Sequence, residues 1–293
     1  VHVWPGSERP LTKHWVSRKL GEILEPVAVK HASLITGVAE GYYDGVFNRN
    51  SHLRGRVVTA AMPYGGDEAD HRAAEALGLT PYLFPTHSNA FRFVYAGAML
   101  PKAYEPLDRV FRAIANNRSS AVDVEFHFIG SGRAPDDKEG YNIRPLAERY
   151  GLWRSVVYEY PARIPYLDVL THLSRADGVF VLGSTEPHYT PSKVYQAVLS
   201  RKPVLAVLHS RSTAAGFLRD TGAGQVLSFE GDTDLGRIEE DFLSKLTEFR
   251  DFAGHFDASR VSRSAFDAFS ARSSAQILAS ALDKAWQIRQ SDT

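Results

Sequence analysis

The sequence predicts an α/β fold in which a parallel β-sheet is covered by helices on both faces. Two continuous apolar runs, 179–182 and 204–207, are typical of strands that are buried on both sides. Between them, residues 194–198 place apolar side chains at helical spacing. The same alternation of apolar runs and helical segments extends from Arg92 to Phe229. It indicates a parallel sheet, because parallel strands need a crossover connection that is usually a helix.

Size and composition exclude several other classes of protein. The 293 residues suffice for two modest domains, and the 34 basic residues balance the 34 acidic ones, so nothing indicates nucleic-acid binding. Cysteine is absent, which excludes disulfides and thiolate metal sites and is typical of a reducing compartment. No apolar run approaches the ~20 residues of a transmembrane helix, and no signal-peptide pattern opens the chain.

The first ninety residues predict a partial α/β unit followed by a connector. Because the chain starts at Val1 in a polar stretch, without a strand ahead of it, we expect it to lack its own beginning. The predicted elements are a helix at 15–30, a strand at 32–39, a helix from Glu40, a strand at 56–61, an irregular stretch at 62–67 and a polar connector at 67–90 with a short amphipathic piece.

The rest of the chain predicts a complete sheet with its helices. The strands are expected at 92–96, 124–129, 156–158, 179–182, 204–207 and 225–229. The helices are expected at 107–114, 142–150, 167–173, 190–202, 210–219, 230–252 and 262–290. The helix at 230–252 is acidic and amphipathic, so we expect it to have one solvated face.

The segment between the two apolar runs carries most of the chemistry. A polar loop at 183–189 contains one acid, Glu186. Thr190 and Pro191 then match the N-cap and the first residue of a helix. A helix N-terminus at the carboxyl end of a parallel strand attracts anions, because its free N–H groups and its dipole point outward.

Polar side chains strengthen this anion site. Ser192 supplies a hydroxyl donor and Lys193 a cation, and Gln196 lies one turn further along, on the same face as Ser192. The alternative is that Ser192 and Lys193 belong to a solvated first turn without a ligand.

These residues resemble the donor-site motif of retaining GT-B glycosyltransferases of the group 1 type. The resemblance rests on Glu186-Pro187, Pro191-Ser192-Lys193-Val194-Tyr195-Gln196 and Lys202-Pro203-Val204. It implies a GT-B fold with a Rossmann-like donor domain. There, Glu186 would contact hydroxyls of the donor sugar, and the helix N-terminus with Pro191, Ser192 and Lys193 would take the nucleotide diphosphate.

The sequence departs from the family pattern at three points. The second acid of the motif, which holds the ribose, falls on Gln196, a weaker and uncharged partner. The gap from Glu186 to this position is two residues longer than the commoner spacing. An Arg that often follows the first glycine of the donor domain is replaced by Ala98, so one phosphate contact is lost.

The same resemblance assigns further positions to the donor nucleotide. Gly97 ends a strand at its carboxyl end, where open α/β sheets bind ligands. Lys102 corresponds to a phosphate-binding lysine if the turn is one residue shorter, the alternative being a solvated loop lysine. Gly130, in a Gly-Ser-Gly turn, resembles the family's glycine turn near the nucleotide. Arg163 and Ile164 would lie at the base and contact it mainly through backbone groups.

The resemblance also predicts the domain organisation. Residues 1–88 would be the last part of the N-terminal acceptor domain with the linker. Residues 89–262 would form the nucleotide-sugar-binding donor domain. Residues 263–293 would form a C-terminal helix that crosses back to the first domain.

The predicted function is retaining transfer of a sugar, with Glu186 and Lys193 nearest the chemistry. The donor would be a nucleotide-diphosphate sugar, with UDP or GDP, and the acceptor a bacterial surface polysaccharide or glycolipid. We expect no metal and no separate cofactor, since Lys193 and N–H groups would stabilise the leaving diphosphate and no Asp-x-Asp pair follows a strand. Because most of an acceptor domain has no counterpart, we expect donor binding but little or no transfer by this chain alone.

Three alternatives remain open from the sequence. One is a sugar-nucleotide epimerase of the same fold, another a non-catalytic partner subunit, and the third an effector-binding module. A loop acid without a ligand is the alternative for Glu186. The expected location is the cytoplasm, with peripheral contact at the inner face of a membrane.

Overall fold

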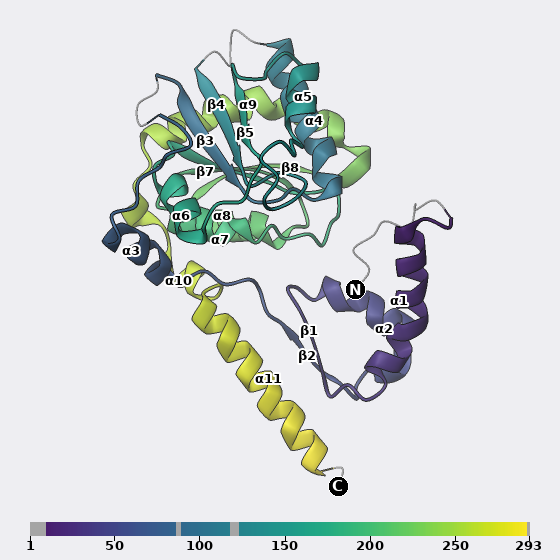
Figure 1. The fold of residues 1–293 in the computed structure, drawn as a ribbon. Helices are drawn as coiled ribbons and strands as arrows, with labels where there is room; N and C mark the ends of the chain where they lie inside the picture. Colours follow the sequence, from purple (N-terminus) through teal and green to yellow (C-terminus); the bar gives the residue numbers. More distant parts are fainter. Residues whose placement is uncertain (1–9, 86–88, 118–122, 292–293) are drawn as a thin grey trace. The chain divides into compact units, whose positions relative to one another are not determined.

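The computed structural model describes residues 10–85, 89–117 and 123–291 of the chain (Figure 1). It contains two compact units. Unit 1 comprises the residues up to Tyr64 together with those from Ala271 onward, and unit 2 comprises Gly65–Ser270. Each unit has its own core.

Unit 2 is built on six parallel strands, which confirms the predicted parallel sheet. The strands are β3 Phe91–Ala96, β4 Val124–Ile129, β5 Val157–Tyr160, β6 Gly178–Leu182, β7 Val204–His209 and β8 Gly224–Phe229. They stand in the order β5–β4–β3–β6–β7–β8, so the direction of winding reverses between β3 and β6. Open α/β sheets bind ligands at the carboxyl ends of the strands at such a switch point.

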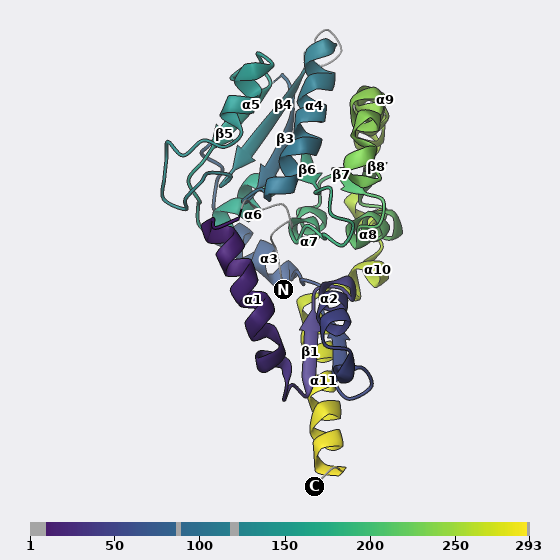
Figure 2. The same cartoon turned by 90° about the vertical axis from the view of Figure 1, so that its right-hand side faces the viewer.

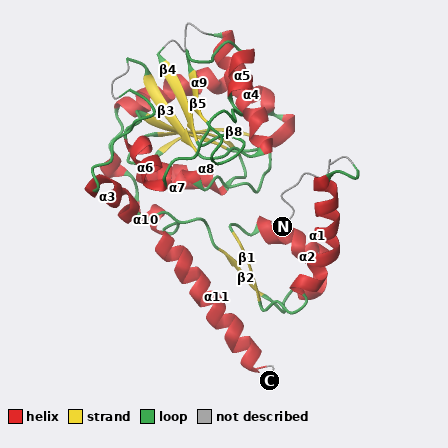
Figure 3. Cartoon of the chain, in the orientation of Figure 1, coloured by secondary structure: helices red, strands yellow, loops and turns green. Residues whose placement is uncertain are grey.

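Helices cover both faces of this sheet, as predicted (Figures 1 and 3). Along β3, Phe93 enters one buried cluster and Val94 the other, since successive side chains of a strand point to opposite faces. The first face carries α4 Tyr104–Asn116, α5 Arg144–Arg149 and α9 Leu235–Gly254. The second carries α6 Tyr166–Ser174, α7 Lys193–Leu199, α8 Thr213–Thr221 and α10 Arg263–Asp267. The remaining elements of unit 2 are α3 Glu68–Ala76, η2 Pro101–Ala103, η4 Gly231–Thr233 and η5 Ala258–Arg260.

The central strands are the two apolar runs on which the prediction rests. Every residue of β6 and β7 is buried. Aromatic rings fill the first face: Phe93 and Phe126 stack with ring centroids 4.8 Å apart, and Phe249 of α9 lies 5.3 Å from Phe93. The amphipathic helix that the sequence predicts at 230–252 therefore closes this face with its apolar side.

The start of α7 differs from the prediction. The helix begins at Lys193, with Ser192 at the N-cap, and no side chain caps it. Thr190 is not the cap, because its buried hydroxyl lies 2.6 Å from the hydroxyl of Thr213 and is engaged there. A tertiary hydrogen bond has replaced the local capping interaction that the sequence suggests.

The predicted helix at 262–290 is interrupted. It consists of α10 and, in unit 1, α11 Ala271–Ser291. The interruption lies where Ser270 forms a β-bridge with Gly66, after Phe266 and Phe269 have packed into the second cluster of unit 2. Helical spacing is present on both sides of the break, so periodicity alone does not reveal it.

Unit 1 is a small α/β unit. Its strands β1 Leu34–Gly37 and β2 Val58–Ala61 pair in parallel and are shorter than predicted. Its other elements are α1 Lys13–Val29, α2 Gly41–Arg49, η1 Ser51–Leu53 and α11. α11 packs on β2, and their contact buries Val58, Ala60, Ala281 and Ala285.

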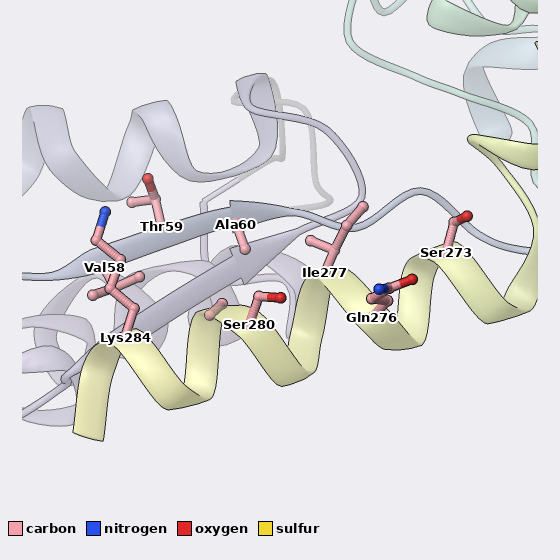
Figure 4. Close-up of a pocket in the computed structure, with 9 residues that line it drawn as sticks. Val58, Thr59, Ala60, Ser273, Gln276, Ile277, Ser280 and Lys284 are labelled. Atoms are coloured by element: carbon pink, nitrogen blue, oxygen red, sulfur yellow. The ribbon is translucent and has the colours of Figure 1, made fainter. Parts of the chain in front are cut away.

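A groove of about 480 Å³ lies between β2 and α11 within unit 1 (Figure 4). Aliphatic and polar side chains share its wall: Val58, Ala60, Ile277 and Ala281 lie beside Thr59, Ser273, Gln276, Ser280 and Lys284. None of the site residues that the sequence predicts lines this groove.

The predicted domain boundaries, 88/89 and 262/263, fall inside unit 2. The connector belongs with the larger sheet, because α3 packs against α6 and the Tyr166 hydroxyl donates to the Asp70 carboxylate at 2.9 Å. That residues 1–88 belong to an acceptor domain and residues 89–262 to a donor domain stays a prediction. Over the ranges that the structure describes, each helix is too short or too polar to span a bilayer.

Candidate functional site

Two glycine turns meet at the carboxyl ends of β3 and β4. Gly97 and Gly130 have φ values of +99° and +68°, which side chains other than glycine rarely adopt. The N–H of Gly97 donates to the Ile129 carbonyl at 2.7 Å, and that of Gly130 donates to Tyr160 at 2.8 Å. A Cβ atom on Gly130 would lie 3.7 Å from the Arg163 Cα and 3.9 Å from the Gly97 Cα. The structure thus brings together three predicted residues from three separate segments.

Lys193 reaches into the same place from the first turn of α7. Its Nζ donates to the Tyr95 hydroxyl at 2.6 Å and to the Ala98 carbonyl at 2.7 Å. It also lies 4.1 Å from the centroid of the Tyr95 ring, within cation–π range. A Cβ atom on Gly97 would lie 3.6 Å from this Nζ. The cation therefore sits directly beside the glycine turn.

The partners of this cation are neutral. Burial lowers the pKa of Lys193 to about 7, because the ammonium loses part of its hydration. Burial also raises the pKa of the Tyr95 phenol well above its ordinary value, so this hydroxyl stays protonated. A phenol and a carbonyl provide hydrogen bonds but no counter-charge. An anionic ligand at this edge would supply the missing charge.

The loop that carries Glu186 lies beside the turn after β3. The Thr185 N–H donates to the Lys102 carbonyl at 3.3 Å, which joins the two segments. Glu186 is half-buried, and its N–H donates to the Ser184 hydroxyl at 3.3 Å. Its carboxylate forms no ion pair with any residue that the structure describes. The acid is thus held by its backbone and keeps its oxygens for another partner.

Gln196 already has a partner within the protein. Its Oε1 lies 3.0 Å from Nε2 of His71 on α3, and burial lowers the pKa of this imidazole. The sequence did not point to His71, because the two residues are 125 positions apart and α3 reads only as a short amphipathic piece. An amide held in this way presents fewer groups to a ligand than the carboxylate of the family pattern.

The predicted base contacts are partly engaged as well. The N–H of Arg163 donates to the Pro135 carbonyl at 2.8 Å, and its side chain is exposed. The side chain of Ile164 packs against the second buried cluster. Pro191 is buried, whereas Ser192 is exposed at the start of α7.

Glu159 is a further residue that sequence reasoning missed. It is only 5% exposed and accepts hydrogen bonds from the Ser131 hydroxyl at 2.8 Å and from three backbone N–H groups. These N–H groups belong to Asn142, Ile143 and Arg144, at 2.9, 2.9 and 2.8 Å. The carboxylate therefore ties the Gly-Ser-Gly turn to the start of α5. Glu159 lies in β5, a short strand in which buried and half-buried residues alternate, and no local sequence pattern marks it for this role.

No cluster of three or more potential metal ligands occurs among the residues that the structure describes. The site offers a cation beside two glycine turns, an exposed hydroxyl on Ser192, and a carboxylate on Glu186 that forms no ion pair among the described residues. Such a set suits a ligand that has both an anionic group and hydroxyl groups.

Solved structures share this fold. HepE of Anabaena, in complex with UDP-glucose, matches with a TM-score of 0.60 and 15% identity over 92% of this chain and 69% of that chain. A UDP-forming α,α-trehalose-phosphate synthase from Burkholderia xenovorans matches with a TM-score of 0.63 and 13% identity, over 91% of this chain and 63% of that chain. Sucrose-phosphate synthase from Thermosynechococcus elongatus matches with a TM-score of 0.57 and 15% identity, over 98% of this chain and 64% of that chain.

The solved structures are GT-B glycosyltransferases, so the chain has the GT-B fold that the sequence motif predicts. The chain spans about two thirds of their length, from 63% to 69%. No protein-family model matches the sequence, and no curated protein matches it. At 13–15% identity the likeness concerns the fold.

Proposed function

We propose that this chain is the donor-binding part of a retaining GT-B glycosyltransferase, a hexosyltransferase that uses a nucleotide-diphosphate sugar. The observation that carries the proposal is the Lys193 ammonium, which lies beside Gly97 with neutral partners at the switch point of the sheet. A diphosphate would supply the negative charge that the neutral partners of the ammonium do not provide. The fold makes this the expected place for it.

Each site residue has a role in this proposal. Lys193 binds the diphosphate, together with Ser192 and the backbone after Pro191. Glu186 binds hydroxyls of the sugar, which is supported by its unpaired carboxylate among the described residues. Lys102 contributes a cation from the neighbouring turn, since its backbone is joined to the Glu186 loop.

The nucleoside would lie over the glycine turns. Gly97 is half-buried and has no Cβ, so a ligand can approach its backbone closely. The base would contact Ile164 and the Arg163 carbonyl, because the N–H of Arg163 is already used. Gln196 would reach the ribose while His71 holds its amide.

Charge development explains how these groups would act. Transfer breaks the bond between the anomeric carbon and the diphosphate oxygen, and the diphosphate leaves with additional negative charge. A preorganised ammonium beside that oxygen stabilises the transition state without reorganisation. Metal independence is part of the proposal and rests on this cation. The acceptor hydroxyl oxygen forms the new bond to the anomeric carbon and gives up its proton to a base.

The base and the acceptor are finer parts of the proposal. HepE binds UDP-glucose and the trehalose-phosphate synthase is UDP-forming, so UDP is the first base to test and GDP the second. A polysaccharide or glycolipid acceptor and contact with a membrane surface rest on the sequence resemblance. One observation supports the membrane contact: α1 exposes Leu20, Ile23 and Val27 by 52%, 68% and 71%. Co-sedimentation with anionic lipid vesicles tests it.

A non-catalytic nucleotide-binding subunit is the second candidate, and one observation favours it. Gln196 is occupied by His71, and Ala98 stands where the family often has an arginine, so two donor contacts are weaker than in the family pattern. Such a subunit would bind nucleotides without turnover. An epimerase would instead release free sugar, so product analysis separates these cases.

The test is thermal stability with UDP, GDP, ADP, CMP and their sugar conjugates. A ligand that binds only the native state stabilises it by ~2.7 kcal/mol at a hundredfold excess over Kd. We expect a rise in Tm with one diphosphate, and Lys193→Ala should lose most of it. Lys202→Ala is the matched control, because Lys202 lies at the amino end of β7, at the opposite edge of the sheet. Absence of any shift in the wild type, or an equal loss in both variants, would overturn the assignment.

A further inference from the structure

The sheet of unit 2 has an unpaired edge at β8. This strand pairs with β7 on one side, and among the residues that the structure describes no strand pairs with its other side. The carbonyls of Ala223 and Phe229 accept hydrogen bonds from the β7 side at 3.0 and 2.8 Å. By alternation, the backbone groups of Val226 and Ser228 point away from β7. Free strand edges of this kind are templates for pairing with another strand.

Helix α9 packs beside β8 (Figure 2). A groove of about 450 Å³ runs along this edge between the two elements. Residues 226–228 of β8 form one wall. The other wall is polar and consists of Arg237, Asp241, Ser244, Lys245 and Glu248. The groove belongs wholly to unit 2 and lies at the outer strand of the sheet, away from the switch point between β3 and β6.

The charges of α9 alternate along the groove. Their order is positive at Arg237, negative at Asp241, positive at Lys245 and negative at Glu248. Within the chain, Arg237 Nε lies 3.4 Å from Asp241 Oδ2, and Lys245 pairs with Glu248. Three of the four side chains remain more than half exposed, so these local pairs contribute little.

An alternating row of four charges is complementary to an antiparallel copy of itself. When a second α9 runs in the opposite direction, Arg237 faces Glu248 of the second copy, and Asp241 faces Lys245 of the second copy. A two-fold axis generates this arrangement and repeats each pair. The same axis sets β8 antiparallel to β8, where both free edges can exchange backbone hydrogen bonds.

We propose that this face binds a second copy of the chain, with β8 and α9 antiparallel to their counterparts about a two-fold axis. The dimer joins the two sheets into one, six strands from each copy. It also covers the groove and turns the local ion pairs of α9 into a network across the interface. The proposal is independent of the nucleotide site.

The test is the molar mass of the full chain by sedimentation and light scattering over a range of concentrations. The wild type should approach twice the mass of one chain, with a dissociation constant that rises with salt. Lys245→Glu and Asp241→Lys should each weaken the dimer at least tenfold, because each sets two pairs of like charges across the axis. Arg250→Glu is the matched control, an exposed charge reversal on α9 outside the groove wall.

Mixing the two variants gives the decisive result. A heterodimer of Lys245→Glu with Asp241→Lys restores opposite charges at both contacts, and so does the double variant with itself. We therefore expect dimers in the mixture and not in either variant alone. A wild type that is monomeric at all concentrations overturns the proposal. In that case the charges of α9 would protect the free edge of β8 from pairing with another strand. A dimer that resists both reversals, or a mixture that stays monomeric, places the interface elsewhere.

Discussion

Lys193 is the residue on which the proposed donor site most depends. Its ammonium lies half-buried at the carboxyl edge of the sheet, with the Tyr95 hydroxyl and the Ala98 carbonyl as partners. Burial favours the neutral amine and brings the pKa to about 7. A bound anion would favour the charged form and raise this pKa. An arginine at this position would stay charged under the same burial, because its pKa does not shift into the physiological range as that of a lysine does.

The residue-scale prediction concerns the pH dependence of nucleotide binding. In the proposed function the diphosphate binds the ammonium form, so its affinity should fall as pH rises above about 7, by at most tenfold per pH unit, until the pKa of the complex is reached. The phosphate itself titrates near pH ~6, below this window. Calorimetry at pH 7, 8 and 9 in buffers of different ionisation enthalpy measures affinity and proton uptake.

Lys193→Arg is the control for this prediction, because a guanidinium keeps its charge throughout the window. Its diphosphate affinity should not change between pH 7 and 9. A wild-type affinity that is equally flat would show that the lysine remains charged without ligand.

At the scale of elements, a buried carboxylate organises the glycine turn after β4. Glu159 of β5 accepts from the Ser131 hydroxyl and from the first N–H groups at the start of α5. Helix α5 has only six residues, so it gains little from its own hydrogen bonds. The acid therefore positions both the turn and the helix. Gly132 is fixed in the same turn, because a Cβ there would lie 2.6 Å from the Pro161 carbonyl.

Glu159→Gln tests this role. The variant replaces one acceptor oxygen by an amide nitrogen that faces N–H donors, so at least one buried donor loses its partner. We expect a loss of about 1–3 kcal/mol in the free energy of unfolding, measured by urea denaturation. Glu148→Gln is the control, because this exposed acid pairs with Arg144 on the surface and should change stability little. If both substitutions change the free energy of unfolding equally, Glu159 does not organise the turn and the start of α5 as we infer.

On the scale of the whole molecule, the two units differ in how well their sheets are buried. Unit 2 has six strands with both faces covered, and β6 and β7 are buried throughout. Unit 1 has two strands, and β2 alternates between buried and more accessible residues. A two-stranded sheet is marginal by itself, so its opening should cost less free energy.

Amide hydrogen exchange should reveal this difference. We expect the amides of β1 and β2 to exchange at least tenfold faster than those of β6 and β7, measured by mass spectrometry under native conditions. The amides of β8 serve as an internal comparison, since this strand belongs to unit 2 but lies at its edge. Protection of β1 and β2 equal to that of β6 would mean that unit 1 opens only with the whole molecule.

The sequence by itself determined the strand–helix alternation, the parallel sheet and the motif from Glu186 to Gln196. These features are local, because periodicity and turn residues act over a few positions. It also placed Gly97 and Gly130 at strand ends, which the structure brings together.

Only the tertiary structure decided which groups these residues meet. Tyr95 receives the Lys193 ammonium, and His71 holds Gln196 across 125 positions of sequence. The break before α11 likewise follows from the bridge between Gly66 and Ser270. Such contacts join segments that are distant in the chain, and no local pattern encodes them, because each depends on how the whole sheet and its helices pack.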